Sequence, residues 1–233
     1  DTIVVEDDKD VLPKGEGNTL FRAAKAIKEH YSIKKGVHIY IEKHIPVGSG
    51  LGGPSSNAAT VLKALTELWD IHPTGDELRG IGAGIGADVP LFLYGKPCIM
   101  EGIGDVITPI ELPSLWYVIV YPEYILSTRE AYSRLKIVLT NNRKNTKLMG
   151  NFKNIDVIIG SLDNDLEQVG ITMCPIIGTI KNRLMDSGAM GSLMSGSGSS
   201  VFGIFRNAND LEESARSLRD FGRVFTAHSH REG

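Results

Sequence analysis

The sequence has few cysteines, no long apolar run and no excess of basic residues, and each lack excludes a class of protein. Only two cysteines occur in 233 residues, and Cys98 and Cys174 lie far apart, which favours reduced thiols in a cytoplasmic protein over a disulfide framework. No run of about 18 apolar residues and no signal peptide is present, so neither a membrane span nor export is expected. The formal charge of −3 argues against a nucleic-acid partner, which needs a basic face.

The histidines show none of the spacings of a zinc site. Of the six, His228 and His230 form a close pair that is more typical of an exposed tail, and we expect no transition metal. Lysine and arginine gather in residues 129–153. We interpret this segment as a solvated basic face around a mobile loop, with attraction of an anionic substrate as the alternative.

The spacing of apolar residues predicts an α+β protein with two lobes, residues 1–112 and 113–233. The predicted helices are 19–30, 55–69, 74–81, 175–187 and one that begins near Asp210. The predicted strands are 2–5, 37–43, 91–94, 115–120, 201–205 and 224–227. Asn18 is placed to begin the first helix, and Thr74 with Glu77 has the form of a capping box.

A glycine-rich loop joins a predicted strand to a predicted helix. The loop is Pro46-Val47-Gly48-Ser49-Gly50-Leu51-Gly52-Gly53-Pro54-Ser55-Ser56. Such a loop turns tightly and directs backbone N–H groups at phosphate oxygens, while the following helix adds the positive end of its dipole. Ser55 and Ser56 are placed to cap the helix, bind phosphate or reach a magnesium ion. The loop matches neither the Walker nor the dinucleotide pattern; the alternative is a tight turn that binds nothing.

Two further segments are candidates for chemistry. Asp88, in Gly86-Ala87-Asp88-Val89-Pro90, could accept or orient the proton of an attacking hydroxyl, although an aspartate in such a segment is also typical of a turn or helix cap. Residues 195–200 read Ser-Gly-Ser-Gly-Ser-Ser and could bring their backbone against the first loop or a substrate, or could form a flexible turn.

These segments together resemble the GHMP kinases, the family of galactokinase, homoserine kinase, mevalonate kinase and phosphomevalonate kinase. The pattern Pro46-x-Gly-x-Gly-Leu-Gly-Gly-x-Ser-Ser-x-Ala-Ala resembles the phosphate-binding motif of that family. Three segments, 52–69, 86–93 and 194–202, resemble the branch that phosphorylates 4-diphosphocytidyl-2-C-methyl-D-erythritol, and Ser127-Thr128 with Ala131-Tyr132 extends the match.

The resemblance implies a fold, a reaction and roles for particular residues. The implied fold has an N-terminal lobe like ribosomal protein S5 and a ferredoxin-like C-terminal lobe, in a monomer or weak homodimer. The implied reaction is transfer of the γ-phosphoryl of ATP, with Mg²⁺, to the 2-hydroxyl of the substrate. In it residues 46–56 hold the phosphates, Asp88 is catalytic, and Asn18 and Lys43 lie near the adenosine. The implied substrate contacts are Asp88, Thr128, Gly196, Ser197 and Gly198.

Each of the flanking residues also has a plainer interpretation from the sequence alone. Asn18 could be only a helix N-cap, Lys43 a solvated strand end, and Thr128 a helix cap. Two alternative functions stay open: the chain could be another GHMP kinase, or a nucleotide-binding fragment without activity.

The sequence departs from the family pattern at its beginning. An Ala-Lys-Ile-Asn-Leu type segment and a Gly-Tyr-His turn, which the family places near its N-terminus, do not occur here. The family's lysine would stand beside the catalytic aspartate and favour its ionised form, and the tyrosine and histidine would hold the cytosine. We therefore expect that N-terminal sequence is missing and that sheet edges are exposed. Pro54 replaces a glycine often found there, which a helix N-terminus should tolerate.

Overall fold

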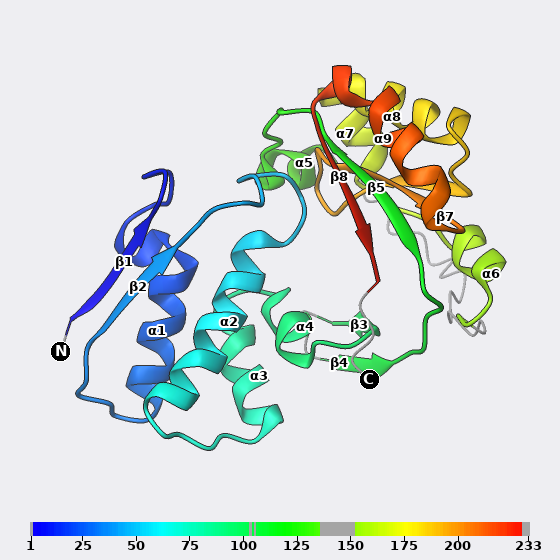
Figure 1. Ribbon diagram of the computed structural model, residues 1–233. Helices are drawn as coiled ribbons and strands as arrows, with labels where there is room; N and C mark the ends of the chain where they lie inside the picture. The colour runs from blue at the N-terminus through cyan, green and yellow to red at the C-terminus, as the bar shows by residue number, and fades with distance from the viewer. Residues whose placement is uncertain (1, 103, 105, 136–151, 230–233) are drawn as a thin grey trace. The chain divides into compact units, whose positions relative to one another are not determined.

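The computed structural model describes residues 2–102, 104, 106–135 and 152–229, and most of its helices and strands are labelled in Figure 1. The chain divides into two compact units. The first comprises residues 1–46 and 52–110, and the second comprises residues 47–51 and 111–233. The glycine-rich loop is therefore shared, because residues 47–51 belong to the second unit while Pro46 and residues 52–56 belong to the first.

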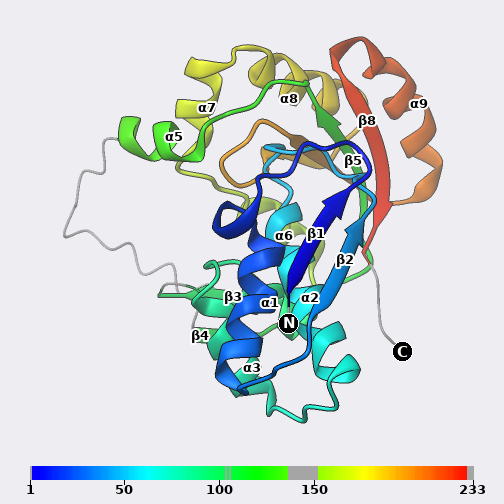
Figure 2. The ribbon, with the colours of Figure 1, turned by 90° about the vertical axis from the view of Figure 1, so that its left-hand side faces the viewer.

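The first unit combines two small sheets with a group of helices. Its elements are β1 Ile3–Asp7, the 3₁₀ turn Gly15–Gly17, α1 Thr19–His30, β2 Val37–Ile41, α2 Gly53–Leu68, α3 Gly75–Ala83, α4 Val89–Tyr94, β3 Cys98–Glu101 and β4 Val106–Pro109. β1 and β2 are parallel, with Ile3 opposite Val37, and lie side by side along α1 (Figure 2). β3 and β4 are antiparallel.

The core of the first unit lies where α1 meets α2. The predicted apolar stripe of α1 is buried, and Ala23, Ala24 and Ile27 have no exposed surface. Ala58 and Leu62 of α2 join them in one cluster. The small alanines of α1 allow α1 and α2 to approach each other closely. This packing against α1 positions α2, the helix that follows the glycine-rich loop.

The second unit is a four-stranded antiparallel sheet with helices packed on it. Its elements are β5 Trp116–Tyr121, α5 Thr128–Arg134, α6 Ile155–Gly160, α7 Glu167–Met173, α8 Ile176–Asp186, β6 Gly191–Met194, β7 Val201–Phe205, the 3₁₀ turn Ala208–Asp210, α9 Leu211–Ser217, the 3₁₀ turn Arg219–Phe221 and β8 Arg223–His228. The strand order is β6-β7-β5-β8.

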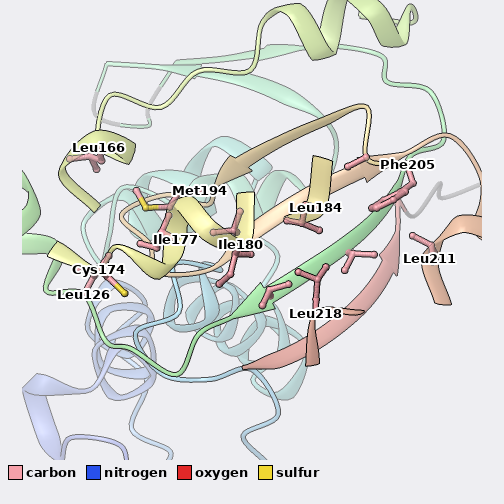
Figure 3. Packing of buried hydrophobic residues seen from close by; sticks show 14 of the residues in the cluster. Leu126, Leu166, Cys174, Ile177, Ile180, Leu184, Met194, Phe205, Leu211 and Leu218 are labelled. Atoms are coloured by element: carbon pink, nitrogen blue, oxygen red, sulfur yellow. The ribbon is translucent and has the colours of Figure 1, made fainter. Parts of the chain in front are cut away.

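The two faces of this sheet bury different side chains. Ile177, Ile180 and Leu184 of α8 pack with Phe205 of β7 in the main cluster (Figure 3). Ile204, the next residue to Phe205, instead joins a smaller cluster with α6. This alternation is the period of two expected of strands covered on both faces. The α+β prediction is confirmed.

One predicted strand is wrong. Residues 91–94 belong to α4, which begins after Asp88 and ends at Gly95 in a left-handed conformation with φ +71°. A short apolar run has no periodicity that separates a buried strand from a buried helix, and Pro90 in the first turn favours the helix. Val89, Pro90 and Leu93 form its buried face.

Some predictions fall outside the part of the chain that the structure describes. Residues 136–151, most of the segment rich in lysine and arginine, and His230 are among them. Within the described residues, no helix combines the length and the apolar character needed to cross a membrane.

Candidate functional site

The glycine-rich loop adopts backbone conformations that only glycine takes easily. Gly48, Gly50 and Gly52 have φ values of +69°, +75° and +67°. A residue with a Cβ in this left-handed region costs about 1–2 kcal/mol. The alternating glycines of the sequence are therefore required by the path of the chain, before any ligand is considered.

The loop ends at the exposed donors of a helix. Gly52 is the N-cap of α2, and Pro54 lies in its first turn. The first bond of the helix runs from the Ser56 N–H to the Gly52 carbonyl, 2.9 Å. The N–H groups of Gly53 and Ser55 precede this bond, so they lie outside the ladder of the helix and can bind an anion. The prediction of a serine cap is wrong, because the cap is a glycine.

Lys43 lies beside the same helix end and is buried. Its residue is only 7% exposed, and a Cβ built on Gly53 would lie 3.8 Å from its Nζ. Its backbone N–H donates to the Asp8 carboxylate, 2.9 Å. Burial lowers the pKa of the Lys43 ammonium, and the negative charge of Asp7 opposes this effect. The interpretation as a solvated strand end is wrong, because the side chain is held against the helix that follows the loop.

Asn18 is the N-cap of α1, as its plainer interpretation predicts. Its Oδ1 accepts from the Leu20 N–H at 2.9 Å, and the residue is 3% exposed. The neighbouring Thr19 hydroxyl donates to the Pro54 carbonyl, 3.3 Å. The start of α1 is thus attached to the first turn of α2. A contact between Asn18 and adenosine stays a prediction.

Asp88 lies near the start of α2 in the first unit. It occupies the N-cap position of α4, but its side chain makes no capping hydrogen bond. A Cβ built on Gly86 would lie 4.0 Å from the Ser55 Oγ, so the turn that carries Asp88 approaches the first turn of α2. Asp88 is exposed, and no hydrogen bond or ion pair joins its carboxylate to another residue in the described ranges. The carboxylate is therefore available to a ligand.

In the second unit the other glycine-serine segment contacts the loop directly. The Ser195 hydroxyl donates to the Gly50 carbonyl at 2.9 Å, and the Ser200 N–H donates to the Ser49 carbonyl at 3.1 Å. A Cβ built on Gly50 would lie 2.4 Å from the Ser195 carbonyl oxygen and 2.7 Å from that of Gly198. Gly198, Ser199 and Ser200 are also buried, so this turn is packed against the glycine-rich loop.

Thr128 and Ser197, two predicted substrate contacts, lie together. Their hydroxyl oxygens are 2.8 Å apart in a hydrogen bond. The cap of α5 is Ser127, whose Oγ accepts from the Glu130 N–H at 3.3 Å, so the capping role considered for Thr128 belongs to its neighbour. Both Thr128 and Gly196 are exposed. Their contacts with a substrate stay predictions.

Sequence reasoning missed two side chains that hold this second segment. Asn164 donates to the carbonyls of Met194 and Gly196, and Glu167 accepts from the Met194 N–H. The spacing Asn-x-x-Glu could have indicated a helix start, but nothing in it indicates partners about thirty residues away. Across the described residues there is no group of three or more His, Cys, Asp or Glu side chains that could hold a metal ion.

Comparison with known proteins gives matches over both units. Residues 18–96 match the family description "GHMP kinases N terminal domain", and residues 143–224 match "GHMP kinases C terminal". The chain is 42% identical over 217 residues to the 4-diphosphocytidyl-2-C-methyl-D-erythritol kinase of Syntrophotalea carbinolica, covering 93% of this chain and 77% of that protein. It is 40% identical over 225 residues to the enzyme of the same name from Thermodesulfovibrio yellowstonii, covering 93% and 79%.

Solved structures have the same fold. A crystal structure of 4-(cytidine 5'-diphospho)-2C-methyl-D-erythritol kinase is similar with a TM-score of 0.76 and 30% identity, covering 98% of this chain and 82% of that one. Homoserine kinase from Cytophaga hutchinsonii has a TM-score of 0.76 at 20% identity, covering 98% and 81%. At that identity the second likeness shows the fold alone.

Proposed function

The chain belongs to the GHMP kinase family, and from that premise we propose that it transfers the γ-phosphoryl group of ATP to the 2-hydroxyl of 4-diphosphocytidyl-2-C-methyl-D-erythritol. The relatives that share about 40% of its sequence carry the name of that kinase. One structural observation supports the proposal: the turn that bears Asp88, an exposed residue whose carboxylate has no described partner, approaches the open N-terminus of α2 that follows the glycine-rich loop.

The loop and α2 are the proposed phosphate site. The N–H groups of Gly53 and Ser55 and the positive end of the α2 dipole favour negatively charged phosphate oxygens. The buried Lys43 ammonium adds a full positive charge beside them. Residues 46–56 hold the triphosphate in this proposal, Lys43 contacts ATP from beside them, and Asn18 lies toward the nucleoside.

The proposed site also suits a magnesium ion carried by ATP. The described residues offer no dedicated carboxylate cluster, and Mg²⁺ bound with a nucleotide takes most of its ligands from phosphate oxygens and water. In this proposal the Ser55 and Ser56 hydroxyls reach that ion. Such an ion neutralises charge on the transferred phosphoryl group.

Asp88 acts on the acceptor in this mechanism. Its carboxylate accepts the proton of the 2-hydroxyl, or orients that hydroxyl by charge, as the hydroxyl oxygen forms a bond to the γ-phosphorus. The bond between the γ-phosphorus and the bridging oxygen breaks, and ADP leaves with the electron pair. Thr128 and residues 196–198 contact the acceptor. We place the reaction in the cytoplasm, where the free thiols of Cys98 and Cys174 stay reduced.

The test is substrate-dependent ADP release, with the product identified by ³¹P NMR. It is run on the 233-residue chain. Asp88→Asn keeps the shape and removes the charge, so kcat is expected to fall about 10²–10⁴-fold. Asp220→Asn is the matched control, because Asp220 is also exposed and makes no described side-chain contact.

Each outcome separates one function from another. Turnover that Asp88→Asn abolishes and Asp220→Asn leaves intact supports the proposal. Turnover with homoserine or mevalonate but not with the proposed acceptor identifies another GHMP kinase. ATP binding by a folded protein without turnover on any acceptor would leave a nucleotide-binding module and refute the proposed kinase.

A further inference from the structure

Asn164 uses its whole side chain to hold the second glycine-serine segment. It lies between α6 and α7, and its Nδ2 donates to the Met194 carbonyl and to the Gly196 carbonyl, each at 2.9 Å. Its Oδ1 accepts from the Leu166 N–H at 3.0 Å. An asparagine amide has two donor hydrogens, and both are committed to the backbone at the end of β6.

Glu167, in the first turn of α7, binds the backbone of Met194 as well. One carboxylate oxygen accepts from the Met194 N–H at 2.9 Å, and the other forms an ion pair with Lys181 of α8. The Glu167 side chain is 15% exposed, so this pair is shielded from water more than a surface ion pair is. The backbone of Met194 is thus bound on both its N–H and its carbonyl by side chains of a neighbouring segment.

Asn164 and Glu167 bind the start of the segment that supports the glycine-rich loop. Directly after Met194, the Ser195 hydroxyl binds the Gly50 carbonyl, and the Ser200 N–H binds the Ser49 carbonyl. Ser197, between them, binds Thr128. Gly196, which Asn164 holds directly, lies in the middle of this set. A shift of residues 195–200 would therefore move both the loop that holds the phosphates and the threonine proposed to contact the acceptor.

We propose that Asn164 is a positioning residue for phosphoryl transfer, supported by Glu167, and that it fixes residues 195–200 and through them residues 47–51. The proposal rests on the proposed function. Asn164 touches neither nucleotide nor acceptor in it. Correct alignment of reacting groups supplies much of the rate in phosphoryl transfer, and a misplacement of about 1 Å can lower a rate about 100-fold.

Local support of the chain just before α7 is the competing explanation for Asn164, and the chain contains a matched control for it. Asn164 lies two residues before the N-cap of α7, Leu166, and its Oδ1 accepts from the Leu166 N–H. Asn154 makes the matching bond at α6, where it is the N-cap and its Oδ1 accepts from the Asp156 N–H at 2.9 Å. In the described part of the chain its amide donates to no other group. Aspartate at either position keeps the oxygen that accepts from the backbone N–H two residues later. Only Asn164→Asp removes two donors, and it also places a carboxylate against two carbonyl oxygens.

The experiment compares Asn164→Asp with Asn154→Asp by steady-state kinetics and by amide hydrogen exchange. Asn164→Asp is expected to lower kcat about 10- to 100-fold, with smaller changes in KM because each substrate keeps its direct contacts. Exchange at the Gly198 and Ser200 amides should be about tenfold faster, because the segment opens more readily once the two hydrogen bonds from the Asn164 amide are lost. Asn154→Asp should change neither kcat nor the exchange rates of these two amides.

Several results overturn the proposal. They are an unchanged kcat in folded Asn164→Asp, a loss of activity equal to the loss of folded protein, or the same loss in Asn154→Asp. If Asn164→Asp does not fold, Asn164→Ser, which keeps a side-chain oxygen without the amide, is judged by the same measurements. If the wild-type chain transfers no phosphoryl group to any acceptor, the proposed function fails together with the role in catalysis, and exchange alone decides whether Asn164 holds the segment.

Discussion

Replacing Gly50 by alanine tests whether the two glycine-rich segments of the second unit are packed as closely as the structure shows. Gly50 has φ +75°, and a Cβ there would lie 2.4 Å from the Ser195 carbonyl oxygen and 2.7 Å from the Gly198 carbonyl oxygen. Both atoms belong to the backbone and cannot turn away as the end of a side chain can. Alanine must therefore strain the backbone or separate the segments.

Straining the backbone and separating the segments should lower the free energy of unfolding by similar amounts. Alanine in the left-handed region costs about 1–2 kcal/mol. Keeping the segments together adds an overpacking term of about 1–3 kcal/mol. Separating them instead loses the bonds from Ser195 to Gly50 and from Ser200 to Ser49, at about 1 kcal/mol each. Gly50→Ala should therefore lower the free energy of unfolding by roughly 2–5 kcal/mol.

Gly188→Ala is the control within the same unit. Gly188 also has a positive φ, +96°, but a Cβ there would meet nothing within 4 Å, so only the conformational term of about 1–2 kcal/mol applies. Urea unfolding is followed by tryptophan fluorescence in a Trp69→Phe background, where Trp116 of β5 reports on the second unit. Equal stability and equal kinase activity of Gly50→Ala and Gly188→Ala would refute the close packing.

Two side chains near the proposed site allow further tests. Thr128→Val removes the hydroxyl that pairs with Ser197; kcat/KM for the acceptor should fall about tenfold while the urea midpoint, measured alongside, stays nearly unchanged because Thr128 is exposed. Lys43→Met removes a buried ammonium whose pKa is lowered by burial, so it should raise stability at pH 7 and weaken ATP binding in calorimetry. The unfolded chain binds the Lys43 proton more tightly, so wild-type stability rises with pH as the ordinary pKa of 10.5 is approached, and the advantage of Lys43→Met should shrink there. A variant less stable than wild type at pH 7 would contradict this.

The helices that the sequence predicted well are those with both periodicity and a recognisable start. The stripe of α1 follows Asn18, which does cap it, and the Thr74 side chain accepts from the Glu77 N–H as a capping box requires. Residues 91–94 lacked such evidence, because four apolar residues fit a strand or a helix equally. The turn chemistry around them, Pro90 in the first turn and Gly95 after the last, decided for a helix.

The partners of the glycine-rich loop could not be derived from its composition. Gly50 and Ser195 are 145 residues apart, and glycine-serine segments give no periodic signal from which a pairing follows. The resemblance to a family indicated both segments, whereas their contacts required coordinates. Asn164 shows the same limit. Its sequence pattern indicates a helix start, whereas its two hydrogen bonds to the carbonyls of Met194 and Gly196 depend on which strand end folds beside it.

Lys43 shows why a proposed binding residue can be hard to recognise from its sequence context alone. A lysine directly after a strand is usually solvated, because the free energy of burying an unpaired ammonium is unfavourable. Here it is buried beside the positive end of the α2 dipole. Burial is the larger effect on its pKa, although the charges of Asp7 and Asp8 also act on it. That arrangement destabilises the free protein and is relieved when an anion binds, so affinity for phosphate and stability without ligand oppose each other at this position. The opposite signs expected for Lys43→Met, higher stability and weaker ATP binding, are the measurable form of that conflict.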